Sequence, residues 1–178
     1  MIEIIVEHIN ELIGRLIDTR ECRIDLQAYT LAESVAIRGD EEGDEEITFP
    51  ALVLPSGECI SVYGETDKHD ITLYHRLNDI SFSEASANSY GSLSEYTETA
   101  DMSLIVFGKR STLSPFEAEG VVRKAVATAG DTSIVRSDFN ALQIFASEYA
   151  GVTYFMSPEY YLFKINYRIT RTYNPRCN

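Results

Sequence analysis

The segment Ala100–Arg110 has the sequence ADMSLIVFGKR and decides the fold of this chain. Successive side chains of a β-strand point to opposite sides, so each side of the segment can be judged separately. Apolar residues occur on both sides, with Met102, Leu104 and Val106 on one and Ile105 and Phe107 on the other. A strand that is apolar on both sides is typical of a sheet covered on both faces. We therefore predict that this segment is a central strand.

The segment directly before this strand, Ile80–Ala100, has the sequence ISFSEASANSYGSLSEYTETA, with no Lys or Arg and few apolar residues. It joins the central strand to an alternating segment, Ile71–Arg76, which predicts another strand. Connections longer than about 12–15 residues are usually binding elements or disordered segments. We therefore expect a long protruding hairpin arm at about residues 80–100, with a mobile tip and with Tyr90 and Tyr96 buried only on assembly.

Two segments carry clear helix signals. Ile2–Leu16 places apolar residues at helical spacing and glutamates on the opposite side, which predicts an amphipathic helix with one buried stripe. Ser114–Glu117 (SPFE) combines an N-cap serine, a proline at the first helical position and a glutamate that can bond back to the cap, which predicts a helix over residues 115–129. A further helix is expected at Ser137–Ala150, with these residues facing inward: Phe139, Leu142, Phe145 and Tyr149.

The remaining pattern predicts a mainly antiparallel sheet. Ile47–Leu54 and Cys59–Tyr63 are two β-rich runs around a Pro-Ser-Gly-Glu turn, and Asp131–Arg136 fits a short strand. Tyr160–Thr172 alternates apolar and polar residues, which predicts a long strand with one buried and one wet face. Residues 18–38 fit either a strand pair or a helix. We expect one α+β domain over residues 1–178, with a mixed, mainly antiparallel sheet packed against two or three helices.

The chain is strongly acidic, with 28 Asp and Glu residues against 15 Lys and Arg residues and a net charge of −13. This charge repels phosphate backbones and argues against specific nucleic-acid binding, although an acidic passage lets DNA slide through. Nearly half of the net charge comes from one run of six acidic residues: Asp40, Glu41, Glu42, Asp44, Glu45 and Glu46. Its spacing does not match a Ca²⁺-binding loop, so we expect a solvated surface or channel loop.

No catalytic, cofactor or metal signature is complete in the sequence. His69 and Asp70 are adjacent and His75 follows, but neighbouring residues of a strand point to opposite faces and do not readily form a dyad. The three cysteines and three histidines are too scattered for a disulfide framework or a metal site. No segment has the pattern of a signal peptide or a membrane span. We expect a soluble cytoplasmic protein that is not an enzyme and binds no cofactor, metal or membrane.

The C-terminal end of the chain reverses the charge, because no acidic residue follows Glu159. A basic strip on an acidic protein can bind the acidic surface of an identical neighbour, although ordinary surface charge has the same pattern. Tyrosine is favoured at protein interfaces, where its ring buries area and its hydroxyl keeps a hydrogen bond. The candidate interface residues are therefore Tyr90, Tyr96, Lys164, Arg168, Arg171 and Tyr173.

The order of these segments resembles that of phage tail terminator and tail-completion proteins. It consists of an amphipathic N-terminal helix, hairpin strands, a long arm, the ADMSLIVFGKR strand, a capped helix and a final FKINYRITR strand. The resemblance implies a structural protein that forms a ring, commonly of six copies, on the tail tube at its junction with the head-proximal connector. Its partners would be further copies of itself, the tail-tube protein and the head–tail connector proteins.

In that family long loops reach neighbouring subunits or the tube, and here those loops would be residues 80–100 and 40–46. The resemblance also implies assembly in the host cytoplasm followed by residence in the virion. A different class of protein remains open on the same sequence, namely a small acidic protein-binding module. Such a module would act as a decoy or adaptor, as a monomer or dimer.

Overall fold

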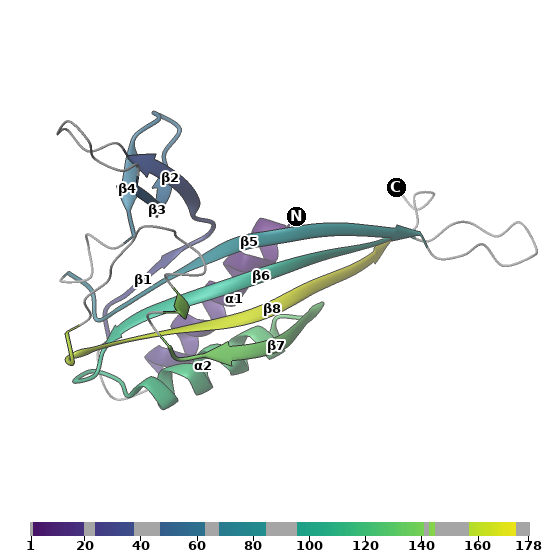
Figure 1. The fold of residues 1–178 in the computed structure, drawn as a ribbon. Coiled ribbons are helices and arrows are strands. Elements are labelled where there is room, and N and C mark those ends of the chain that lie inside the picture. Colours follow the sequence, from purple (N-terminus) through teal and green to yellow (C-terminus); the bar gives the residue numbers. More distant parts are fainter. Residues whose placement is uncertain are drawn as a thin grey trace, which may run out of the picture.

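The structure, a computed structural model, describes residues 2–19, 24–37, 47–62, 68–84, 96–140, 143–144 and 157–173. Within these residues the chain is an α+β fold with a mixed five-stranded sheet, a three-stranded sheet and two helices (Figure 1). The elements are, in chain order, α1 (Ile2–Asp18), β1 (Leu26–Tyr29), β2 (Glu33–Ile37), β3 (Ile47–Val53), β4 (Cys59–Ser61), β5 (Ile71–Glu84), β6 (Tyr96–Lys109), α2 (Pro115–Thr128), β7 (Thr132–Asp138) and β8 (Tyr160–Tyr173).

The large sheet has the strand order β1-β5-β6-β8-β7, so β6 is its central strand, as its sequence predicts. Only β1 and β5 pair in parallel; the other neighbours are antiparallel. In the middle of the sheet Leu104 of β6 lies between His75 of β5 and Ile165 of β8. The small sheet joins β2, β3 and β4, and it contains the hairpin expected around the Pro-Ser-Gly-Glu turn.

Both faces of the large sheet carry apolar side chains. On one side, here called the helix face, residues such as Leu73, Leu104 and Phe163 form the main core with the buried stripe of α1 and with α2. The opposite face carries a smaller cluster that includes Ile105 and Leu162. Burial on both sides explains why the β6 sequence has no continuous polar face.

The start of α2 has the expected capping box. Ser114 accepts a hydrogen bond from the Glu117 backbone N–H at 3.3 Å, and the Glu117 carboxylate accepts one from the Ser114 N–H at 3.2 Å. These two bonds satisfy donors that a helix N-terminus would otherwise leave unpaired. The helix ends before Gly130, whose φ of +76° suits a residue without a side chain.

Several sequence-based expectations need correction or remain open. The helix predicted to start at Ser137 is wrong at that end, because Ser137 and Asp138 belong to β7. Phe139 packs against the buried ring of Phe163, with ring centroids 5.6 Å apart, but is still 44% exposed, and Leu142, Phe145 and Tyr149 lie outside the described residues. Residues 18–38, which the sequence left ambiguous, contain the last residue of α1 and the two short strands β1 and β2.

The final strand also differs from its prediction. Leu162 lies on the face of β8 predicted to be wet, yet it is only 3% exposed, because the smaller apolar cluster covers that half of the strand. The protruding hairpin arm is not confirmed, since residues 85–95, which include Tyr90, lie outside the described residues. The residues on either side of that gap belong to β5 and β6, which are sheet strands.

Candidate functional site

The three long strands β5, β6 and β8 run past α2 and β7 to a common end (Figure 1). At that end Glu84 of β5 pairs with Tyr96 of β6, which in turn pairs with Tyr173 of β8. We call this region the sheet extension and define it as Asp79–Glu84, Tyr96–Asp101 and Arg168–Tyr173. It is the part of the described structure with the clearest character of an interaction surface.

The two faces of the sheet extension differ in chemistry. The register and the alternation of side chains place small polar residues on the face opposite the helices: Ser81, Ser83, Thr97, Thr99, Thr170 and Thr172. The helix face instead carries mostly apolar and aromatic residues: Ile80, Phe82, Tyr96, Ala100, Ile169 and Tyr173. Glu84, Glu98 and Arg171 lie among these apolar residues.

Part of the apolar face is exposed. Phe82 is 65% exposed, Tyr173 46% and Ile80 36%. At the base of the extension Leu77 is 37% exposed, and on the first turn of α1 Ile4 is 67% exposed. Single exposed apolar residues are ordinary, but apolar residues grouped on one face of a sheet usually mark an interaction surface.

A β-bulge places these apolar residues on one face. The pairing of β5 with β6 shifts between Leu77 and Asp79, which leaves Asn78 as the extra residue. Leu77 pairs with Met102 and Ile80 pairs with Ala100, so both point to the helix face although their numbers differ in parity. Asn78 is tied down by a hydrogen bond of 2.8 Å from its amide to Ser103 Oγ. Without the bulge, Ile80 and Phe82 would point to the polar face.

Two of the three tyrosines expected at an interface belong to the sheet extension. Tyr96 and Tyr173 lie side by side at the end of the sheet extension, with ring centroids 6.0 Å apart in a stacked arrangement. Tyr96 is half-buried already in the isolated chain, while Tyr173 remains exposed. Tyr90 and the acidic run Asp40–Glu46 lie outside the described residues, so their roles stay predictions.

Among the described residues, the expected basic strip is not a set of free cations. Lys164 is only 4% exposed and lies inside the fold, so it is not available on an outer face. Arg168 donates two hydrogen bonds to the Asp101 carboxylate, at 2.7 and 3.3 Å, and this interaction raises the pKa of Arg168. Arg171 lies 3.7 Å from the Asp131 carboxylate. The two arginines therefore neutralise carboxylates of their own chain.

The histidines do not form a catalytic dyad. His69 Nδ1 lies 3.1 Å from a carboxylate oxygen of Asp25, whereas the carboxylate of the adjacent Asp70 accepts a bond from the Asp25 N–H. His75 is completely buried between Asn10, whose Oδ1 lies 2.9 Å from Nε2, and Tyr167, whose hydroxyl lies 2.8 Å from Nδ1. Because Asn10 Oδ1 can only accept, Nε2 carries the proton and Nδ1 accepts from the tyrosine.

Burial also decides the charge of His75. It lowers the pKa of the imidazole from 6.5 to about 3, so the ring is neutral at pH 7. A neutral imidazole without contact to solvent joins α1 to the sheet and is out of reach of a substrate. Sequence reasoning left this histidine as a remote catalytic candidate, and the structure assigns it to the core.

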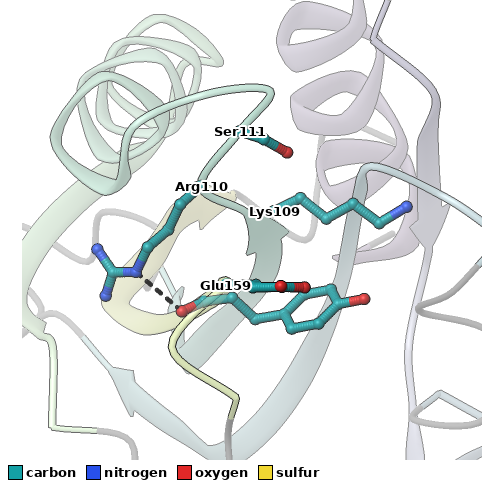
Figure 2. A pocket seen from close by; sticks show the side chains of 5 residues that line it. Lys109, Arg110, Ser111 and Glu159 are labelled. Atoms are coloured by element: carbon teal, nitrogen blue, oxygen red, sulfur yellow. Dashed lines mark hydrogen bonds between the residues drawn. The ribbon is translucent and has the colours of Figure 1, made fainter.

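A hollow of about 540 Å³ lies at the other end of β6 (Figure 2). It is lined by Lys109, Arg110, Ser111, Glu159 and Tyr160. Arg110 Nε donates to the Tyr160 carbonyl at 3.0 Å, the dashed line in Figure 2. Lys109 lies 3.7 Å from the Asp70 carboxylate. Lys109 is therefore paired with a carboxylate of its own chain, and Arg110 joins the end of β6 to the start of β8.

In the described part of the chain, no group of three or more His, Cys, Asp or Glu side chains is placed to hold a metal ion. None of its helices is both long and apolar enough to cross a membrane.

No protein-family model and no curated protein matches this sequence. The resemblance to tail terminators therefore stays a prediction, and the sheet extension is the feature from which a function can be argued.

Proposed function

We propose that this protein is a structural virion-assembly protein that acts by self-association. In this proposal it forms a ring at the head-proximal end of a phage tail tube, as tail terminator proteins do. The observation that carries the proposal is the sheet extension, whose helix face exposes Phe82, Ile80 and Tyr173 next to a polar opposite face. A protein that works by contact needs such a surface, and a catalytic pocket is not required of it.

The exposed apolar side chains would contribute free energy to self-association. Fully burying a large apolar side chain contributes about 1.5–3 kcal/mol. Phe82, Tyr173 and Ile4 are each about half or more exposed, so each has a substantial part of that free energy still to gain. Together they would contribute several kcal/mol per contact, against an association cost of roughly 4–15 kcal/mol. Association through this surface alone would be weak, and repeated contacts in a closed ring would reinforce it.

The charge of the chain supports the proposed location. A net charge of −13 makes the surface repel phosphate backbones. A ring that surrounds moving DNA benefits from such a wall, because DNA does not adhere to it. The tail-tube and connector proteins would then be bound through protein surfaces, with no specific contact to nucleic acid.

The proposal is tested by measuring the molar mass of the purified chain over a wide range of concentration, using size-exclusion chromatography with light scattering. We expect discrete oligomers larger than the 20.0 kDa chain, and rings in electron micrographs when isolated tail tubes are added. A monomer at every concentration, with no ring on the tubes, contradicts the proposal. If that monomer bound a basic protein with steep salt dependence, the acidic adaptor would be the better description.

A further inference from the structure

Within the described residues, the large sheet ends in two open edges. On one side β1 pairs only with Ile71–Tyr74 of β5, and the next contact is a hydrogen bond from the Ala32 N–H to the His75 carbonyl. From Arg76 to Glu84, β5 has no strand on its outer side within the described part of the chain. On the other side of the sheet β7 is the last strand. Open edges offer backbone donors and acceptors for pairing with another chain.

We propose that the open edge of β5 in one copy pairs with β7 of the next copy, so that the large sheets of neighbouring subunits join into one. This inference rests on the proposed self-association and names the surfaces that carry it. Because two different edges meet, the contact is heterologous, and repetition gives a ring when the rotation closes.

The strand directions fit this pairing. Each step from β5 to β6, from β6 to β8 and from β8 to β7 is antiparallel, so β7 runs opposite to β5. A second copy in the same orientation, placed beside β5, therefore presents its β7 antiparallel to β5. The helices of both copies then lie on the same side of the joined sheet.

Two charged residues define the register between β5 of one copy and β7 of the next. Pairing Asp79 of β5 with Arg136 of β7 places a carboxylate opposite a guanidinium. Asp79 pairs with Asp101 in its own sheet, and Arg136 pairs with Asn166, so both side chains belong to the face opposite the helices. Within the described residues neither Asp79 nor Arg136 has an ion-pair partner. Opposite charges across neighbouring strands are favourable, and the Asp79–Asp101 pair would gain from an added cation.

The same register also places side chains of the helix face of β5 opposite side chains of the helix face of β7. Each strand has one irregularity, between Leu77 and Asp79 in β5 and between Ile134 and Arg136 in β7. The two extra residues compensate each other, so Ile80 meets Ile134 and Phe82 meets Thr132, all four on the helix face. The pairing spans the whole length of β7, with Val135 as the extra residue. A shift by one residue would place the apolar residues of one strand against the polar residues of the other.

Disulfide trapping in the full-length chain tests the pairing. In a background with Cys22, Cys59 and Cys177 replaced by Ser, two variants are prepared separately: Ser81→Cys and Ser133→Cys, which the register places opposite each other. We expect a covalent dimer on oxidation of the mixture and none with either variant alone. The chain carrying both substitutions should give a ladder of covalent oligomers, because each copy then offers both halves of the contact.

Charge exchange provides an independent measurement. Asp79→Arg and Arg136→Asp should each weaken association by roughly five- to tenfold, and the two substitutions in one chain should restore it. Lys124→Glu, at an exposed position of α2, is the control and should leave association unchanged.

The outcomes separate this inference from the proposed function. Oligomers that form without the Ser81–Ser133 cross-link, or whose association ignores both charge exchanges, overturn the edge pairing and leave the self-associating function standing. A covalent dimer of Ser81→Cys alone indicates β5–β5 pairing and also overturns the inference. A strict monomer in light scattering overturns both.

Discussion

Lowering the pH from 7 to 5 should cost this fold about 2 kcal/mol through His75 alone. The imidazole is 0% exposed, and burial lowers its pKa from 6.5 to about 3. The unfolded chain binds a proton at this side chain below pH 6.5, while the folded chain does so only near pH 3. The stabilising contribution is therefore complete above pH 6.5 and is lost as the pH falls toward 3. At pH 5 the difference of 1.5 pH units corresponds to about 2 kcal/mol.

The free energy of unfolding in urea, measured at pH 7, 6 and 5, provides the test. The wild-type chain should lose stability over this range, and His75→Gln should lose much less, even though that variant is less stable at pH 7. His8→Gln is the matched control, because the His8 side chain is 46% exposed, and it should keep the wild-type dependence. The range stops at pH 5 because carboxylates begin to contribute below it. An identical pH dependence in wild type and His75→Gln would refute the assignment of a buried neutral imidazole.

Three further substitutions have defined expectations. Phe82→Ser should change the free energy of unfolding of the monomer, measured in urea, by less than about 0.5 kcal/mol. The same variant should weaken self-association, measured by light scattering. Val53→Ser, at another exposed apolar position, should leave association intact. Gly108→Ala should destabilise the chain by about 1–3 kcal/mol or more, because an added Cβ would overlap the Tyr161 ring. A variant as stable as wild type in thermal unfolding would disprove that contact. Ser114→Ala should cost about 1 kcal/mol by removing the cap of α2, with reduced helicity in circular dichroism as the check.

Local signals in the sequence predict much of this fold. The SPFE motif defines the start of α2 because the capping box depends only on residues within one helical turn. The alternation in ADMSLIVFGKR predicts a central strand because side-chain parity is fixed by the strand itself. The N-terminal helix follows from the spacing of its apolar residues in the same way.

Other features depend on contacts between distant segments, and the sequence does not reveal them. The bulge at Asn78 reverses the parity of β5, so Ile80 and Phe82 look like isolated apolar residues in a polar loop. Lys164 looks like a surface residue because its neighbours in sequence alternate, but its side chain is covered in the folded chain. The exposed apolar face of the sheet extension could be recognised only after the register of β5, β6 and β8 was known.

Native mass spectrometry of the wild-type chain is the most direct test of the central claim, that this protein works by assembling with copies of itself. The account predicts one dominant closed oligomer, with a mass that is a whole multiple of 20.0 kDa, and a smaller share of that oligomer in Phe82→Ser and in Asp79→Arg. A wild-type chain that stays at 20.0 kDa would contradict it, whereas an oligomer that both variants form equally well would contradict only the assignment of the contact to the sheet extension.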